Sequence, residues 1–423
     1  MYTFWDIVCG KIRKIKIGVV NMKIEIISPK DSGSCGKLRF AKPTQEEIEK
    51  ATKEIWRFCC KRLGKLFAET DLVGDWLGAE IYNVQVTETT HHFLILKEIA
   101  EVSRENGYPM LVEGNLSSSL IAYLLGITNV NPLKAHYYCE NEECSENYEL
   151  IKDYPFGIDG EDKLCPKCKR KMTKDGYGLK FIAWGPLRYP KVPDFSIEIA
   201  SEIRPYIETR LNQKFASVKS DEEAYLEFNL NDSCNCSYTG NMYKLSGVKP
   251  EGEQFTNEVY LEVLKNLSEE VKEEIETLKI DKESGLARSI DFAEELSNIK
   301  TCNFHTLCRI LALYHGSFKN GKSIKNLENP DFFVTREELI SQLASIGFSD
   351  KSYLDFAKHG VWSRGENKKA YISMLKEHNA PEQLIENFKN TTNLWPMCAC
   401  ITRMQLSCEK AWYELNFPEL KNR

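Results

Sequence analysis

The segment YPKVPDFSIEIASE, which runs from Tyr189 to Glu202, carries side chains that could bind metal ions. Asp194, Ser196 and Glu198 alternate with apolar residues, and a period of two predicts a short strand with these three on one face. Acids two residues apart on a strand face can hold paired magnesium ions for phosphoryl transfer. Because serine occupies the middle position, the segment is either a metal site that lacks one ligand or an ordinary strand whose Glu198 faces solvent at an edge.

Four cysteines form a second group with a chemical signature. Cys139 and Cys144 are followed by Cys165 and Cys168, the latter two within a Cys-Pro-Lys-Cys pair. Two thiolate pairs at this spacing match a zinc ribbon, in which four sulfurs close the tetrahedron and leave no open position for catalysis. We therefore expect a structural Zn²⁺ in an insert at 136–178. The odd total of 15 cysteines favours free thiols elsewhere over a disulfide framework.

Two stretches place basic residues near aromatic ones, a pattern that favours contact with nucleic-acid phosphates. The first is CPKCKRKMTKDGYGLKF, and the second is HGVWSRGENKKAYISML. The candidate contacts are Lys167, Lys169, Arg170, Lys171, Arg364, Lys368 and Lys369. A solvated basic loop is the alternative interpretation of both stretches.

A phosphate-binding loop is suggested by GSFKNGKS, from Gly316 to Ser323, which satisfies the pattern G-x4-G-K-[ST]. Lys322 would reach the phosphates and Ser323 would bind magnesium, as in an ATPase. That function requires a strand before the loop, whereas FHTLCRILALYH fits a helix at least as well. We therefore expect no working nucleotide loop here.

The composition sets the class of protein. The 423 residues are 42% hydrophobic and carry a formal net charge of −6, so the chain can bury a sizeable core and is not drawn to nucleic acid by bulk charge. The first residues have their charges after an apolar start, the wrong order for a signal peptide. No apolar run reaches the roughly 18 residues that span a membrane. These features predict a cytoplasmic protein with no membrane partner.

The patterning predicts an α+β protein with four parts. Residues 1–42 are strand-rich, and 43–250 form a mixed domain that contains the cysteine insert. A strongly charged helical connector at 251–300 leads to a mostly helical domain at 301–423. Pro43 and Thr44 are start signals for the first long helix.

Several segments resemble one family, the bacterial family-C replicative DNA polymerases of PolC type. GYPMLVEGNLSSSLIAYLLGITNVNPLKAHYYC resembles the palm segment that carries a phosphate-contacting Gly/Ser loop, here Gly114, Ser117 and Ser118. KVPDFSIEI resembles the strand with two catalytic aspartates, and the helical stretch from FHTLCRILALYHGS onward resembles the region after the palm. The resemblance covers roughly 80–200 and 300–420. It implies a nucleotidyltransferase-type palm with a zinc-ribbon insert and a helical C-terminal domain.

The departures from the family indicate a truncated, degenerate relative. The first catalytic aspartate corresponds to Asp194, but the second corresponds to Ser196, and a phosphate-facing arginine corresponds to Glu113. A weaker alignment places Ser246 at the third acid, and the family's lysine–histidine segment reads WPMCACIT here. Two-metal catalysis needs carboxylates that bridge both ions. We therefore expect an inactive protein, with Mg²⁺ bound only if Asp194 and Glu198 keep residual catalysis.

Three functions remain open from the sequence. The first is a replication-associated protein, of a plasmid or mobile element or a modulator of the host enzyme, that binds primer–template DNA, single-stranded DNA or replisome components without synthesis. The second is a residual DNA-directed DNA polymerase or nucleotidyltransferase. The third is a protein-binding mimic of a replicase that does not contact DNA.

Overall fold

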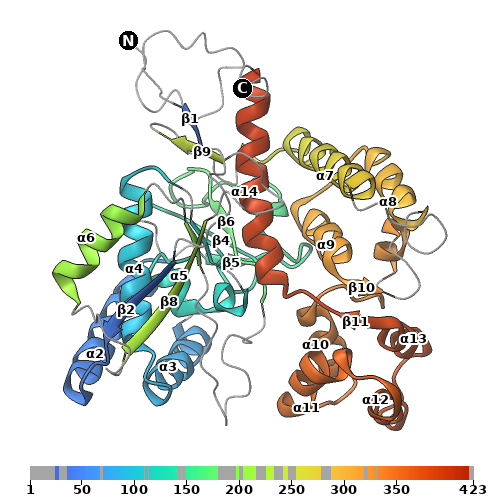
Figure 1. Ribbon diagram of the computed structural model, residues 1–423, viewed down its shortest axis with the longest axis horizontal. Helices are drawn as coiled ribbons and strands as arrows, with labels where there is room; N and C mark the ends of the chain where they lie inside the picture. The colour runs from blue at the N-terminus through green and yellow to red at the C-terminus, as the bar shows by residue number, and fades with distance from the viewer. Residues whose placement is uncertain are drawn as a thin grey trace.

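The computed structural model describes residues 24–27, 36–66, 70–108, 110–112, 114–141, 144, 148–179, 197–199, 203–215, 225–232, 242–245, 254–277, 287–318, 323–329 and 331–418. Helices and strands both occur in this part of the chain, with helices predominating (Figure 1). No helix of the described ranges is long and apolar enough to cross a membrane.

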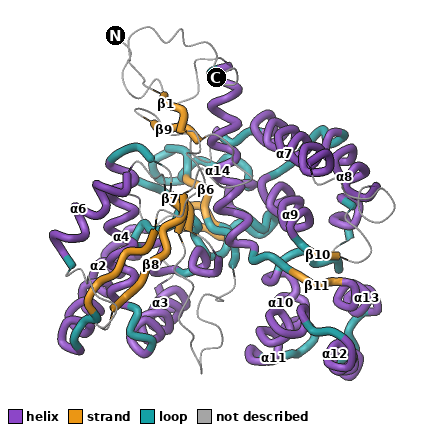
Figure 2. Tube along the Cα trace, viewed as in Figure 1, coloured by secondary structure: helices purple, strands orange, loops and turns teal. Residues whose placement is uncertain are grey.

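A four-stranded mixed sheet organises the first half of the chain. Its order is β2 (Gly36–Ala41), β8 (Tyr225–Asp232), β7 (Ile197–Ile199) and β3 (Met110–Val112). β2 and β8 pair antiparallel, β8 and β7 parallel, and β7 and β3 antiparallel. β7 is therefore an inner strand. Figure 2 shows β2 and β8 side by side. A separate two-stranded sheet joins β1 (Ile24–Ile27) to β9 (Met242–Leu245).

Helices pack with this sheet around one apolar core. They are α2 (Gln45–Leu66), α3 (Thr70–Val86), α4 (Thr90–Glu105), α5 (Leu120–Leu124) and α6 (Arg204–Lys214). The core includes Ile55, Leu96, Ile121, Ile197 and Ile199. Burying such side chains contributes roughly 1.5–3 kcal/mol each.

The helix start predicted at Pro43 and Thr44 is confirmed. Thr44 accepts a hydrogen bond from the backbone N–H of Glu47 at 3.3 Å, and its own N–H donates to the Glu47 carboxylate at 2.8 Å. These two hydrogen bonds satisfy the backbone N–H groups of Thr44 and Glu47, which have no partner within the helix. The segment that resembles the family's palm forms β3, the 3₁₀ turn η1 (Gly114–Ser118) and the apolar helix α5.

The cysteine insert is a small antiparallel sheet of order β5 (Tyr148–Leu150), β4 (His136–Tyr138) and β6 (Thr173–Asp175). The short turn η3 (Gly157–Asp159) lies between β5 and β6 and contacts the helical half of the chain. Asp159 accepts hydrogen bonds from the backbone N–H groups of Phe304 and His305, at 2.7 and 2.9 Å. These N–H groups belong to the first turn of α9 (Phe304–His315), so the insert caps a distant helix.

Part of the segment expected as a charged helical connector at 251–300 packs in an apolar core. It contains α7 (Asn257–Thr277) and α8 (Ala287–Ser297), which share this core with α9 and α14 (Met397–Asn416). The α7 side chains in this core are Val259, Tyr260, Val263, Leu264, Leu267 and Val271. Their spacing marks one apolar face of a helix whose other face carries the charges. Figure 1 shows α14 running from the helical half of the chain past the sheet.

A third core lies in the remaining helices. α10 (Arg336–Ser345), α11 (Asp350–Asp355), α12 (Gly365–Glu377) and α13 (Glu382–Asn390) enclose a cluster that includes Leu339, Phe356, Leu375 and Phe388. The short strands β10 (Ser317–Phe318) and β11 (Thr391–Asn393) connect this cluster with α9 and α14. The 3₁₀ turn η8 (Ile324–Glu328) lies between β10 and α10.

Candidate functional site

The centre of the candidate site is Glu198 on β7. Its neighbours in the sheet register are Leu111 on β3 and Asn231 on β8. The side chain is 6% exposed, so the interpretation of Glu198 as a solvent-facing residue on an edge strand is wrong. β7 lies between two strands because both β3 and β8 pair with it. Asp194 lies outside the described residues, as do Ser196, Glu113 and Ser246.

Glu198 is paired with an arginine from the far end of the chain. Nη2 of Arg403 on α14 lies 3.3 Å from Oε1 of Glu198, and both side chains are largely buried. The same guanidinium lies over the ring of Trp395, 5.5 Å from its centroid. A buried carboxylate needs a compensating charge, and Arg403 supplies it. Sequence reasoning missed Arg403 because one arginine in an amphipathic helix gives no local signal.

The Gly/Ser loop turns at η1 beside this pair. Gly114 has φ +66°, a conformation that favours glycine. The buried Ser117 hydroxyl donates to the carbonyl of Val112 at 2.9 Å, and the Ser118 hydroxyl donates to the carbonyl of Asn115 at 2.7 Å. Both hydroxyls therefore hold the loop in shape. Cys398 on α14 contacts the same loop, with Sγ 3.4 Å from the carbonyl oxygen of Gly114.

The backbone N–H groups that follow the Gly/Ser loop bind the carboxylate of Glu80. Glu80 on α3 accepts hydrogen bonds from the N–H groups of Leu120 and Ile121, at 2.9 and 3.0 Å, and from the Ser119 hydroxyl at 2.6 Å. Trp76 donates a fourth, at 2.9 Å. Burial raises the pKa of Glu80, while these four donors act in the opposite direction. Sequence reasoning missed Glu80, because three of its four donors lie 39 to 41 residues away.

The four cysteines of the insert converge. Their sulfur atoms all lie within 4.8 Å of one another, and Cys139 and Cys168 are 3.5 Å apart. The turn that carries Cys165 and Cys168 is closed by the bond from Lys169 N–H to the Cys165 carbonyl, 2.9 Å. A hydrogen bond from the backbone of Arg170 is the main cause that lowers the pKa of Cys168, to about 6, which favours the thiolate. Four thiolates at these distances could hold a metal ion, and zinc is the ion that such a donor set suits best.

The basic residues after the cysteines lie at the surface. Lys167, Lys169, Arg170 and Lys171 are all exposed. Lys171 forms an ion pair with Asp162 at 3.0 Å. In the second basic stretch, Arg364 is exposed, and exposed Lys369 pairs with Glu366 at 2.6 Å. An exposed ion pair contributes little to stability, so these groups can exchange partners.

Lys368 differs from its neighbour and requires a correction. The side chain is buried, and its ammonium donates to the carbonyls of Gly360, Val361 and Thr391, each at 3.1 Å. It also lies 3.9 Å from the centroid of the Phe388 ring. We expected a contact with nucleic acid, but this charge is committed to the interior of the third core.

The GSFKNGKS segment does not have the surroundings of a nucleotide loop. A helix, α9, precedes it, as expected. The Ser323 hydroxyl donates to the Glu295 carboxylate at 2.8 Å, and the N–H of Ile324 donates to the same carboxylate at 2.6 Å. Lys322 lies outside the described residues.

Comparison with known proteins defines the class and then the family. Residues 49–306, more than half of the chain, match the model described as the bacterial DNA polymerase III alpha NTPase domain. The protein is thus of the replicative polymerase class, and the chain belongs to this family. The resemblance to PolC-type polymerases inferred from the sequence is confirmed.

Similar curated proteins carry the name DNA polymerase III PolC-type. The Thermotoga maritima protein is 39% identical over 112 residues, which are 26% of this chain and 8% of the relative. The Lactococcus lactis protein is 34% identical over 137 residues, 32% of this chain and 8% of the relative. The Bacillus subtilis protein is 31% identical over 163 residues, 38% of this chain and 11% of the relative. The matches therefore span about a tenth of the relatives' length.

Proposed function

We propose that this chain is a replication-associated member of the polymerase family that binds DNA without synthesising it. The ion pair between Glu198 and Arg403 is the observation that carries the proposal. Two-metal phosphoryl transfer needs carboxylates that are free to bridge the ions. A fixed positive charge 3.3 Å from the Glu198 carboxylate opposes a divalent cation at the same place. The serine at 196 removes a second acid from the same segment.

The loop that contacts phosphates in the family gives further support. The Ser117 and Ser118 hydroxyls donate to carbonyls of the loop, and the amides at the start of α5 donate to Glu80. An incoming triphosphate would have to displace a carboxylate that is fully buried. We therefore propose that these hydroxyls, amides and the Glu80 carboxylate stabilise the fold. The proposed function does not use Mg²⁺.

DNA contact is assigned to the exposed basic residues. These are Lys167, Lys169, Arg170, Lys171, Arg364 and Lys369. The four cysteines form a zinc ribbon in this proposal, with Zn²⁺ as a structural ion that fixes the loop bearing the first four basic residues.

The decisive experiment combines primer extension with DNA binding on the same zinc-loaded protein. We expect no extension with Mg²⁺ or Mn²⁺, and binding to primed and single-stranded DNA that weakens steeply with salt because phosphate contacts release counterions. Extension that is lost in Asp194→Ala would establish a residual nucleotidyltransferase instead. If the protein does not bind DNA even at low salt, the remaining candidate is a protein-binding mimic of a replicase that does not contact DNA.

A further inference from the structure

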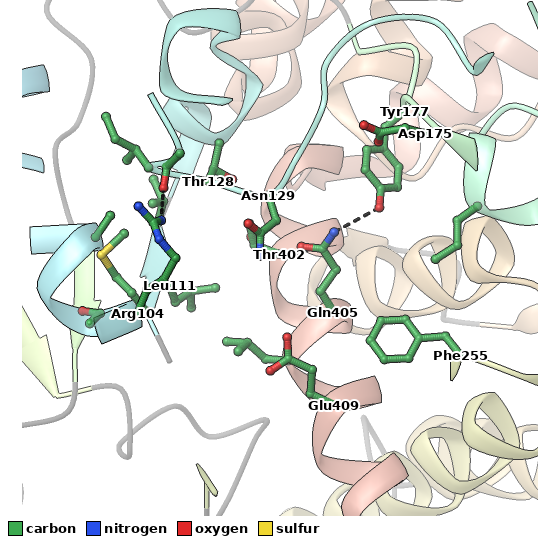
Figure 3. A pocket seen from close by; sticks show the side chains of 18 of the residues that line it. Arg104, Leu111, Thr128, Asn129, Asp175, Tyr177, Phe255, Thr402, Gln405 and Glu409 are labelled. Atoms are coloured by element: carbon green, nitrogen blue, oxygen red, sulfur yellow. Dashed lines mark hydrogen bonds between the residues drawn. The ribbon is translucent and has the colours of Figure 1, made fainter. Parts of the chain in front are cut away.

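A cavity of about 540 Å³ lies beside β3. Its walls come from α2, α4, β3, the loop after α5, the cysteine insert and α14. None of the residues of η1 lines it. The volume is typical of pockets that bind small molecules. Figure 3 shows Arg104 on one side of this space and Gln405 and Glu409 of α14 on another.

Two arginines converge at one wall of this cavity. Arg62 of α2 donates to the carbonyl of Leu124 at 2.8 Å, and Arg104 of α4 donates to the carbonyl of Gly126. A Cβ added at Gly126 would lie 3.4 Å from a nitrogen of each guanidinium. Both guanidiniums therefore lie close to the backbone of Gly126. The carbonyls orient both arginines, yet each guanidinium has five N–H donors.

Neither arginine has a carboxylate partner within the described ranges. The acids nearest along α4 are engaged elsewhere, since Glu101 pairs with Lys97 at 2.6 Å and Glu105 pairs with Arg210 at 2.7 Å. Arg62 still opposes the charge of Arg104, and Glu101 and Glu105 act on Arg104 in the other direction only through space. An anion bound between Arg62 and Arg104 would remove that repulsion, and paired guanidiniums match the oxygens of a phosphate.

A third group, in the same wall, lacks a partner. Ser103 lines the cavity and is 2% exposed, and its Oγ has no hydrogen-bond partner in the part of the chain that the structure describes. Leaving a buried hydroxyl unpaired costs about 1–3 kcal/mol. A ligand oxygen beside Arg104 would satisfy it.

The other walls suit the rest of a nucleotide. Tyr108, Tyr138 and Phe255 are half-buried aromatic residues that line the cavity, and aromatic faces stack on nucleobases. Glu409 lies on the α14 wall, where a carboxylate can accept hydrogen bonds from sugar hydroxyls or base amino groups. The cavity thus has two arginines at one wall, while Lys174 and Asp175 of the insert and Glu409 of α14 line other walls.

From these contacts we infer that the cavity binds a nucleotide, with its phosphate between Arg62 and Arg104 and its base in the aromatic part. The phosphate belongs either to a free nucleotide or to the phosphorylated 5′ end of a nucleic-acid strand. This site is separate from the exposed basic residues assigned to DNA contact, and it requires no polymerase activity.

The test is equilibrium binding to the full chain with four probes. These are dAMP, inorganic phosphate, and one oligonucleotide with either a 5′-phosphate or a 5′-hydroxyl. We expect saturable binding of dAMP, of the 5′-phosphorylated strand in preference to its hydroxyl counterpart, or of both, and the pattern identifies the source of the phosphate. Arg62→Gln with Arg104→Gln should weaken that binding by about tenfold or more. Arg57→Gln, an exposed arginine on the same helix α2, should leave it unchanged.

A milder variant keeps the test valid if the double variant does not fold. Ser103→Ala should weaken binding about threefold to tenfold, without loss of stability because its hydroxyl has no partner to lose. Absence of saturable binding by both phosphorylated probes would overturn the inference. Unchanged affinity in the double variant would also overturn it. If the double variant does not fold, unchanged affinity in Ser103→Ala would do the same. Inorganic phosphate that binds as tightly as dAMP would overturn the assignment of a nucleotide.

Discussion

Arg403 and Glu198 form a buried ion pair at 3.3 Å although 205 residues separate them in the sequence. The pair joins the last helix of the chain to the inner strand of the four-stranded sheet. It also marks a difference between the site expected from the sequence and the site observed, because one of the two interpretations placed Glu198 at a solvent-facing edge, whereas the residue is buried.

Replacing the arginine should destabilise the fold. Arg403→Met leaves Glu198 buried without its cation, which typically costs about 3–5 kcal/mol. Adding Glu198→Gln removes the uncompensated charge and should restore much of the loss. Urea unfolding of the two single variants and the double variant measures the coupling free energy. Lys410→Met is the control, since Lys410 forms a longer pair with Glu414 on the same helix, at 3.7 Å. Strictly additive effects at 198 and 403 would contradict a direct pair.

Glu337 should make the stability depend on pH. Burial raises its pKa from 4.5 to about 7, although its carboxylate accepts the N–H of Met397 at 2.7 Å. Because the folded state binds the proton more tightly than the unfolded state, this stabilising contribution is complete below pH 4.5 and is lost as the pH rises through about 7. A shift of this size corresponds to about 3 kcal/mol.

Glu337→Gln isolates this effect, because the amide oxygen can still accept the Met397 N–H. The difference in free energy of unfolding between the natural protein and Glu337→Gln should change in favour of the variant as the pH rises. Denaturant titrations at several pH values measure it. A difference that stays constant between acidic and neutral pH would show that Glu337 does not titrate in this range.

Metal content should depend on the four cysteines of the insert. We expect about one zinc ion per chain in the purified protein and almost none in Cys165→Ser. A chelator should lower the melting temperature of the natural protein because structural zinc contributes to folding. Elemental analysis and thermal unfolding report the two effects. Cys60→Ser is the matched control, as Cys60 is exposed and lies outside the cluster; equal metal loss in both variants would count against the cluster.

The adjacent lysines 368 and 369 should behave differently. Lys368→Met removes the ammonium that donates to the carbonyls of Gly360, Val361 and Thr391, and should cost about 1–3 kcal/mol. Lys369→Met removes an exposed pair and should change stability by less than about 0.5 kcal/mol. In DNA binding the order should reverse, with Lys369→Met weakening affinity. Unfolding curves and binding isotherms on the same two proteins provide both readouts. Equal stability of the two variants would contradict the buried position of Lys368.

Local patterns predicted much of the fold. Pro43 and Thr44 predicted the start of α2, where the Thr44 hydroxyl accepts the N–H of Glu47. The spacing of the cysteines anticipated their cluster. Such features depend on neighbours within a few residues or on a strict ligand pattern, which a sequence displays directly.

Features that depend on distant partners could not be predicted. Nothing near Lys368 distinguishes it from Lys369, because its burial depends on the carbonyl of Thr391 and the ring of Phe388. Glu80 is one acid among many until α5 packs beside it. The many charged residues of α7 suggested an exposed helix. Its apolar face is buried because it packs in one core with α9 and α14.

The late position of Arg403 has a consequence for biosynthesis. A ribosome adds Glu198 to the chain 205 residues before it adds the cation that neutralises it. At a translation rate of roughly 5–20 residues per second, that interval lasts about ten to forty seconds. During this time we expect the nascent sheet to remain incompletely closed, so the emerging polypeptide would be a substrate for chaperones until α14 docks.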